Sequence, residues 1–457
     1  MLRFFRINDP YRLVIIFVLM VIVRLVQGYF IEGQSYYELK WLLLGEWLNQ
    51  GFKMYDETYD YTGPIAVFIY KYLFWIFGRT SFIHYGFSSI VIIFQAGIFN
   101  QLLLKNKAYD ENGYLPAFLY MILMVSVPDF MALSPQLLSL TFILLALRNV
   151  LRRIDNQVTD ELFLNSGIYI GIATMIYLPS MVFFLVFLFA LILFSTAVTR
   201  RLLLYLFSFL LAFSLCGLYF YWSGGFWNFV DSYLVQNLLM NTESVLSATD
   251  IFVICVGFFL IFILSVFKTW SSARLTNFQQ KIQQVIWLMF LGGIATFFLS
   301  NEKSLHELVF VIPVIAYFWT HYFILLKRRI FKFLMPLLLV FGLLTFSIYS
   351  YSNIYNELKV VHNETQESPT MILGANLSYY TGSKVLTPCF NTHLTNKALK
   401  GLDYYNSASN FYQLFLRANP EIIIDEIGIM PKITRRFPKI EETYKVVGQD
   451  MYRKINN

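Results

Sequence analysis

The chain has 457 residues, of which 57% are hydrophobic, 19% are aromatic and only 14% are charged. This composition excludes an ordinary soluble enzyme. Several apolar runs, among them residues 13–31, 202–222 and 333–351, have the length of roughly 20 residues with which a helix crosses the hydrocarbon layer of a membrane. The sequence therefore predicts a polytopic α-helical membrane protein.

The formal net charge of +7 raises the question of an anionic partner, which the distribution of the 35 Lys and Arg answers. Short segments on one side of the predicted spans hold 17 of these residues, and the membrane-proximal segments on the other side hold 5. Because basic loops stay in the cytoplasm, the N-terminus is expected inside and the loop after the first span outside. The net charge gives no reason to expect a nucleic-acid partner.

In chain order we expect about eleven membrane spans, at residues 13–31, 82–104, 114–128, 136–151, 163–177, 180–198, 202–222, 251–267, 282–300, 306–326 and 333–351. The pair around Leu178 and Pro179 is predicted as two short helices, because a proline disfavours a helical residue before it. An odd number of spans brings the C-terminal tail out on the extracytoplasmic side.

The first outside loop, residues 32–81, carries its own structure. Polar residues recur at three-to-four spacing over 34–49, which predicts a helix lying in the membrane interface. A second short helix is expected over 64–77, because Pro64 suits a first turn and Gly78 suits a helix end. We assign residues 1–351, this loop included, to one transmembrane domain.

From residue 352 the composition turns polar and no further span follows. Residues 370–374 and 421–425 are predicted as buried strands and 411–418 as a helix. Residues 352–457 are therefore expected to form a soluble, extracytoplasmic α/β domain.

Acidic residues of the first loop are the first candidates for chemistry: Glu32, Glu38, Glu46, Asp56, Glu57 and Asp60. One interpretation is a solvated loop whose acids have no catalytic part. The other is a carboxylate that deprotonates an acceptor hydroxyl, or that binds a divalent cation. Glu32 is the strongest individual candidate, because it stands at the end of the first span, where burial raises the basicity of a carboxylate.

The order of these features is one span, an acid at its outer end, an interfacial helix, Gly51-Phe-Lys-Met-Tyr-Asp56, Tyr61-Thr-Gly-Pro64, a helix ending Ile-Phe-Gly78 and a second span. It resembles the N-terminal module of the GT-C superfamily of membrane glycosyltransferases, in particular the bacterial branch related to protein O-mannosyltransferases and the lipid A aminoarabinose transferase. The resemblance implies a GT-C fold in a bacterial cytoplasmic membrane. It also implies a sugar donor on polyprenyl phosphate, with Glu32 as the catalytic base. In the reaction that we expect, Asp56 or Asp60 assists Glu32 or holds a divalent cation.

A later segment, Ser304-Leu-His306 to Pro313, resembles the place where these enzymes begin a span with a basic residue. Lys303 and His306 are accordingly candidates for binding the donor phosphate, since a cation stabilises the charge that grows on a leaving oxygen. Gln136 stands where the family often has an aspartate, and Asp129 is a secondary acidic candidate in its place. The implied reaction is an inverting transfer to a protein, lipid or glycan acceptor outside the cytoplasmic membrane.

Departures from the family pattern keep two alternatives open. Gly33 interrupts the usual acidic pair after the first span, and Thr62 and Gln136 replace acids. These changes favour, as the main alternative, a non-catalytic scaffold that keeps the GT-C framework and docks partners. A lipid or solute transporter is less favoured, because the spans hold few charges and contain no clear inverted repeat.

Overall fold

The computed structural model describes residues 2–5, 7–30, 35–154, 159–194, 199–239, 243–244, 247–326, 369–374, 376–380, 384–448 and 450–455, together with the isolated positions 342, 345 and 349. Its internal contacts divide the chain into two compact units. Unit 1 comprises Met1–Glu32, Phe82–Cys216 and Thr242–Glu357, and unit 2 comprises Gly33–Ser81, Gly217–Asn241 and Leu358–Asn457. The proposed boundary between domains at residue 351 stays a prediction.

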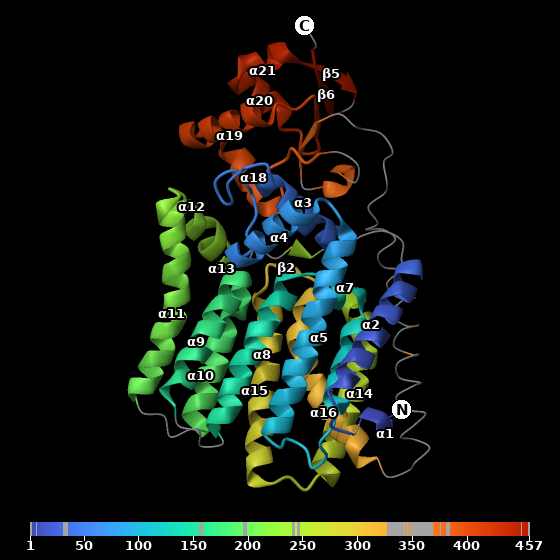
Figure 1. Ribbon diagram of the computed structural model, residues 1–457. Coiled ribbons are helices and arrows are strands. Elements are labelled where there is room, and N and C mark those ends of the chain that lie inside the picture. The colour runs from blue at the N-terminus through green and yellow to red at the C-terminus, as the bar shows by residue number, and fades with distance from the viewer. Residues whose placement is uncertain are drawn as a thin grey trace. The chain divides into compact units, whose positions relative to one another are not determined.

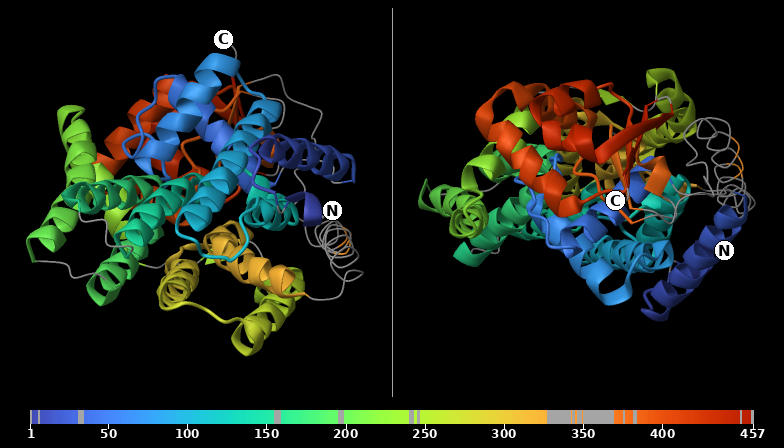
Figure 2. Two further views of the ribbon diagram at one scale, coloured as in Figure 1. Left: turned by 60° about the horizontal axis from the view of Figure 1, so that its bottom comes forward. Right: turned by 90° about the horizontal axis from the view of Figure 1, so that it is seen from above.

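Unit 1 is a bundle of helices (Figure 1; seen obliquely from its lower end in the left panel of Figure 2). Its elements are α1 (Leu2–Phe5), α2 (Tyr11–Phe30), α5 (Ser81–Lys105), α6 (Leu115–Val125), α7 (Pro128–Met131), α8 (Pro135–Ile154), α9 (Asp160–Ile176), η1 (Leu178–Met181), α10 (Val182–Phe194), α11 (Thr199–Trp222), α14 (Ala248–Ser272), α15 (Asn277–Leu299), η3 (Leu305–Val311) and α16 (Ile312–Leu325). The break at η1 falls at Pro179, where the sequence predicts two short helices.

Six of the described helical segments are long and apolar enough to cross a membrane: Tyr11–Phe30, Ser81–Lys105, Thr199–Trp222, Thr249–Ser271, Asn277–Leu299 and Leu305–Leu325. The protein is thus a multi-pass membrane protein, as the composition indicates. Helices α6, α8, α9 and α10 coincide with four further predicted spans, although α6 has only 11 residues and α10 only 13. The predicted span at 333–351 lies outside the described residues apart from three isolated positions, so the total of eleven stays a prediction.

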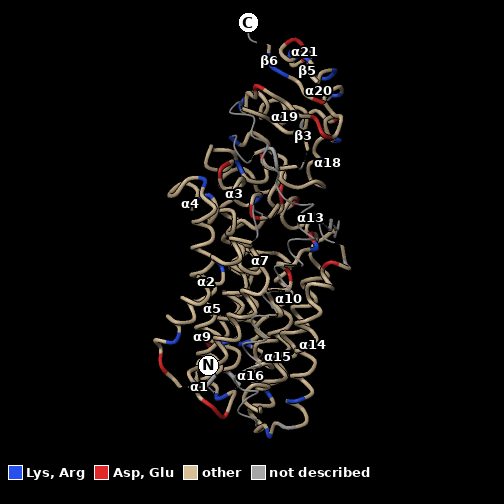
Figure 3. The backbone as a smooth tube through the Cα atoms, turned by 90° about the vertical axis from the view of Figure 1, so that its right-hand side faces the viewer, with Lys and Arg blue, Asp and Glu red and all other residues tan. Residues whose placement is uncertain are grey.

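Small residues and satisfied polar groups allow these helices to pack closely. A Cβ atom on Gly167 of α9 would lie 2.4 Å from the carbonyl oxygen of Tyr205 in α11, so the absence of a side chain brings the two helices together. In α2, Arg24 donates to the carbonyl of Tyr85 and to the hydroxyls of Ser88 and Ser89 at 2.8–3.0 Å. Charged residues of the bundle otherwise lie mainly at its ends (Figure 3).

Two very short strands join loops at one end of the bundle. β1 (Glu243–Ser244) pairs in parallel with β2 (Glu302–Lys303), which follows α15 directly. This pairing fixes the start of the segment 300–311, which includes Lys303 and His306, the residues predicted to bind phosphate.

Unit 2 contains a four-stranded sheet in the order β3-β4-β6-β5. β3 (Thr370–Leu373) and β4 (Ile422–Asp425) are parallel, and β6 (Met451–Lys454) continues the sheet antiparallel to β4 and to β5 (Tyr444–Gly448). Between β3 and β4 lie η4 (Leu377–Tyr380), α18 (Thr392–Lys400), η5 (Gly401–Asp403) and α19 (Tyr405–Ala418), and α20 (Met430–Arg436) and α21 (Pro438–Thr443) follow β4. The two strands and the helix predicted from the sequence are all present.

The first loop supplies the rest of unit 2. Helices α3 (Tyr36–Asn49) and α4 (Pro64–Phe77) agree with the two predicted helices. Aliphatic and aromatic residues of α3 share one apolar core with β3, β4 and α19. Residues 51–63 are also tied to the C-terminal part, because the amide of Tyr59 donates to the carbonyl of Pro388 at 2.8 Å. Residues 217–241 add α12 (Phe226–Phe229), the π-helix η2 (Val230–Val235) and α13 (Gln236–Leu238).

The burial of α3 differs from the predicted amphipathic surface helix. All residues from Tyr37 to Leu48 are buried except Glu38, which is half-buried. Charged Lys40 and Glu46 are included, because partners within unit 2 satisfy them. By contrast, α4 exposes a large apolar face that includes Trp75 at 70% and Ile76 at 59%, which suits contact with a membrane interface. The placement of both helices at the interface stays a prediction.

Candidate functional site

A buried polar cluster in unit 1 surrounds the carboxylate of Glu307. This side chain is fully buried and accepts hydrogen bonds from Gln136 Nε2 at 2.8 Å, Ser300 Oγ at 2.9 Å and the Tyr177 hydroxyl at 2.5 Å. We call these four residues the Glu307 cluster. They come from the first turn of α8, the residue after α9, the residue after α15, and η3, so one carboxylate joins the ends of four elements.

Next to Glu307, the imidazole of His306 faces the carboxylate of Asp129. His306 Nε2 lies 4.0 Å from Asp129 Oδ1, and the two side chains are 0% and 1% exposed. Asp129 belongs to the short helix α7, which begins at Pro128. The structure thus brings together two residues that were predicted separately, one as a phosphate ligand and the other as a secondary acid.

Lys303 lies in β2 and uses its ammonium group to cap α15. Its Nζ donates to the carbonyl oxygens of Phe297, Phe298 and Ser300 at 2.7–2.8 Å. A cation at the C-terminal end of a helix satisfies free carbonyls and offsets the negative end of the helix dipole. Burial lowers the pKa of Lys303, and the nearby Glu307 opposes this shift. The role of Lys303 in binding phosphate stays a prediction.

In unit 2, Asp60 forms a closed ion pair. Its Oδ1 lies 3.0 Å from Lys40 Nζ, with the two side chains 0% and 2% exposed, and its Oδ2 accepts from the Thr62 hydroxyl at 2.5 Å. Lys40 also lies over the ring of Tyr61, with Nζ 5.5 Å from the ring centre. The ammonium group of Lys40 and the hydroxyl of Thr62 therefore hold this carboxylate within unit 2.

Asp56, the other predicted carboxylate of the loop, is half-buried and less enclosed. Its Oδ1 accepts from Asn228 Nδ2 at 2.5 Å, and a Cβ atom on Gly225 would lie 3.1 Å from its Oδ2. The preceding residue, Tyr55, has a positive φ of 68° and donates its hydroxyl to the carbonyl of Thr62 at 2.6 Å. A left-handed backbone at a tyrosine is strained, so this anchored ring fixes the turn that carries Asp56.

Glu32, the predicted base, lies outside the described residues. Within the described residues, no group of three or more His, Cys, Asp or Glu side chains has the arrangement of a metal site. The divalent cation considered from the sequence stays a prediction.

Glu307 is the principal residue that the sequence interpretation missed. It is part of the segment Ser304 to Pro313, but only Lys303 and His306 were singled out there. A carboxylate at the start of an apolar span is costly unless it is satisfied, and that was the available signal. Its three donors are 130, 171 and 7 positions away in the chain, so the two distant ones were not foreseeable by spacing.

Comparison with known proteins assigns the fold. No protein-family model and no curated protein matches the sequence. Among solved structures, the chain is similar to ArnT, the aminoarabinose transferase from Cupriavidus metallidurans, bound to undecaprenyl phosphate, with a TM-score of 0.57, 12% identity and coverage of 98% of this chain and 99% of that one. The apo state of ArnT gives a TM-score of 0.56 at 12% identity, covering 96% and 97% of the two chains.

The oligosaccharyltransferase of Archaeoglobus fulgidus in its apo form is a further similar structure. Its TM-score is 0.50 at 11% identity, and the match covers 98% of this chain and 75% of that one. ArnT and this oligosaccharyltransferase are both membrane glycosyltransferases of the GT-C superfamily. The chain therefore has the GT-C fold, as the resemblance of its N-terminal module implies.

Proposed function

We propose that this protein is a GT-C-type membrane glycosyltransferase that transfers a sugar from a polyprenyl-phosphate-linked donor to an acceptor outside a bacterial cytoplasmic membrane, with inversion at the anomeric carbon. The observation that carries the proposal is the similarity to ArnT along nearly the whole length of both chains. That ArnT structure contains undecaprenyl phosphate, a polyprenyl phosphate, which is the basis for proposing the same class of lipid here.

An inverting transfer needs two chemical contributions from the protein. A base removes the proton of the acceptor as it attacks the anomeric carbon, and positive charge or aligned donors stabilise the departing phosphate. We assign the base to Glu32, because it follows the first span and is the position that the family resemblance indicates. The C–O bond to the phosphate breaks as the bond to the acceptor oxygen forms, and the acceptor proton goes to the Glu32 carboxylate.

Of the two aspartates in the loop, Asp56 is the better candidate to assist. It is half-buried and its one described hydrogen bond comes from a neutral amide, so its charge is available to a substrate hydroxyl or a cation. Asp60 is fully buried and its charge is balanced by Lys40. Asp60 is therefore assigned the role of positioning residues 56–62.

Lys303 is the preferred cation for the donor phosphate, because it is half-buried whereas His306 is fully buried. Three carbonyls at the end of α15 hold its ammonium group in one place. A phosphate would compete with these carbonyls as a stronger, charged acceptor. His306, which lies next to Asp129, is then assigned a positioning role: it keeps η3 in place.

The test is the glycan profile of the exported and membrane fractions of a deletion strain that carries the wild-type gene or a variant. Glu32→Gln and Asp56→Asn are expected to leave the glycan missing although the protein reaches the membrane in normal amount. The matched control is Glu57→Gln, because Glu57 follows Asp56 directly but is engaged by Arg417 at 2.9 Å. If Glu32→Gln restores the glycan as well as the wild type does, Glu32 is not the base.

A second candidate function is a non-catalytic scaffold with the GT-C fold. The observation that favours it is that Gln136, at a position where the family often has an acid, donates its amide to Glu307. In that case deletion changes no glycan, and Glu32→Gln leaves the assembly of any complex intact. Loss of a glycan on deletion together with failure of Glu32→Gln to restore it would reject the scaffold.

A further inference from the structure

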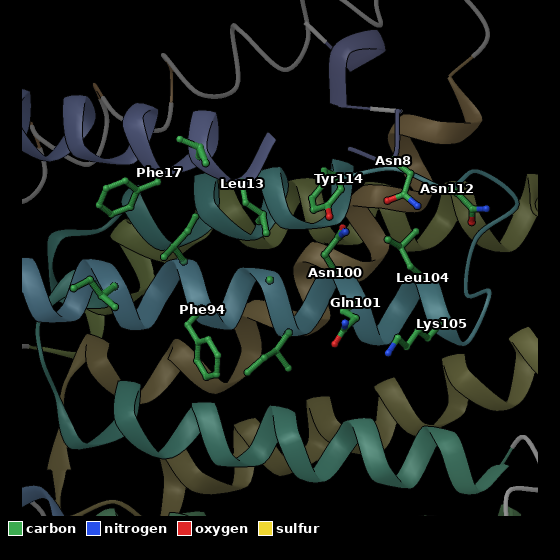
Figure 4. A pocket seen from close by; sticks show the side chains of 15 residues that line it. Asn8, Leu13, Phe17, Phe94, Asn100, Gln101, Leu104, Lys105, Asn112 and Tyr114 are labelled. Carbon is green, nitrogen blue, oxygen red and sulfur yellow. The ribbon is translucent and has the colours of Figure 1, made fainter. Parts of the chain in front are cut away.

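A long groove of about 990 Å³ runs between α2 and α5 in unit 1 (Figure 4). Its walls include Leu13, Val14 and Phe17 from α2, and Ile93 and Phe94 from α5. Val14 is 59% exposed and Phe94 is 55% exposed, so the groove opens on the outer face of these two helices. Both helices are candidate membrane spans, and the groove therefore faces the lipid phase.

The two ends of the groove differ in chemistry. Figure 4 shows Phe17 and Phe94 toward one end, whereas Asn8, Gln101, Lys105 and Asn112 gather at the other. Lys105 is in the last turn of α5 and is the one charged residue among the fifteen that line the groove. The surface is thus amphiphilic along its length, with a hydrogen-bonding, cationic end at the membrane boundary.

A small residue on α5 leaves room in the apolar part of the groove. Gly97 lines the groove, and a Cβ atom there would approach Leu13 Cδ1 to 3.7 Å, so any larger side chain would fill the space.

We propose that this groove is a binding site for an anionic glycerophospholipid. One acyl chain lies along α2 and α5, and the phosphate lies at the end formed by Lys105 and the side-chain amides. An amphiphile with one polar head matches a groove that is polar at one end only. The apolar surface of a partner's transmembrane helix would leave the polar groups at this end without a matching head group. The site does not depend on the proposed glycosyltransferase function.

The experiment uses the full-length protein in detergent and native mass spectrometry, with phosphatidylglycerol and phosphatidylcholine added at equal concentrations. The wild type is expected to retain phosphatidylglycerol in preference. Lys105→Gln should reduce this preference about fivefold, since one cation near an anionic lipid contributes on that scale. Lys107→Gln is the matched control, because Lys107 lies two positions along at the same end but does not line the groove.

A second pair of variants tests the acyl-chain part of the site. Gly97→Phe should abolish retention of both lipids, whereas Gly86→Phe, at an open and exposed position on the same helix, should leave it unchanged. If Gly97→Phe does not fold, Val14→Trp blocks the groove from the α2 side. Equal loss with Lys107→Gln and Lys105→Gln, an unchanged preference in Lys105→Gln, or a copurifying protein that cross-links to position 94 would each overturn the proposal.

Discussion

Two buried carboxylates, Glu307 of unit 1 and Asp60 of unit 2, are satisfied in opposite ways. In unit 1, Glu307 is surrounded by neutral donors, namely an amide and two hydroxyls. In unit 2, Asp60 is paired with a buried ammonium group at 3.0 Å. Glu307 has no such ion pair with Lys303, the lysine nearest to it in the sequence, because the ammonium group of Lys303 donates to the carbonyls at the end of α15.

This contrast determines how costly it is to remove the charge of each carboxylate. Removal of one charge from an ion pair leaves the other charge buried and uncompensated, and that is costly. Removal of a charge from a ring of neutral donors leaves dipoles that partly rearrange around the new group. The two sites should therefore respond differently to the same chemical change, a carboxylate replaced by its amide.

The largest effect is expected from Asp60→Asn. This change removes the charge that Asp60 places 3.0 Å from the ammonium group of Lys40, which is 2% exposed, and should lower the free energy of unfolding by about 3–5 kcal/mol. Thermal unfolding of the purified protein in detergent measures the loss. The double variant Lys40→Met/Asp60→Asn should recover most of it, and a double variant as unstable as Asp60→Asn alone would contradict the ion-pair explanation.

Elements with local signals were predictable from the sequence. Helix α4 has the predicted bounds because Pro64 occupies its first position and Gly78 ends it with a φ of 68°. β3 and β4 follow from short apolar runs between turn residues. The GT-C fold was identified from the order of features around residues 31–82, which needs no knowledge of packing.

The partners within the sites were not predictable, because they are distant in the chain. Gln136 and Tyr177 lie 171 and 130 positions from Glu307, and no spacing rule joins them. Burial of α3 also depends on β3, β4 and α19, which the chain supplies more than 300 residues later. Asp56 and Asp60 looked equivalent in the sequence, and only their neighbours separate the half-buried carboxylate from the paired one.

Glu307→Gln is expected to have a smaller effect than Asp60→Asn. The new amide keeps one acceptor oxygen but places an NH₂ group against former donors, which should cost about 1–3 kcal/mol. The same thermal measurement applies, and Glu302→Gln, at a half-buried position five residues earlier, is the control and should change little. If Glu307→Gln lowers the free energy of unfolding as much as Asp60→Asn does, neutral donors do not reduce the cost of replacing a buried carboxylate by its amide.

Lys303→Met tests whether the ammonium group stabilises the end of α15. Three carbonyls lose a charged donor, and a loss of about 1 kcal/mol is expected. Lys281→Met, at an exposed position near the other end of the same helix, should have no comparable effect. Equal stability of Lys303→Met and the wild type would mean that solvent replaces the lysine at these carbonyls without cost.

The smallest effect is expected at an exposed ion pair of unit 2. Lys397 Nζ lies 3.0 Å from Asp231 Oδ2, but the two side chains are 48% and 53% exposed, and Asp231 Oδ1 also accepts from Gln236 Nε2 at 3.0 Å. Lys397→Met should therefore cost less than about 0.5 kcal/mol, because water and salt screen both charges. Unfolding measured at low salt and at about 1 M salt separates the two kinds of pair. The small loss for Lys397→Met should vanish at high salt while the loss for Asp60→Asn persists, and a salt-sensitive Asp60→Asn would mean that solvent reaches the Lys40–Asp60 pair.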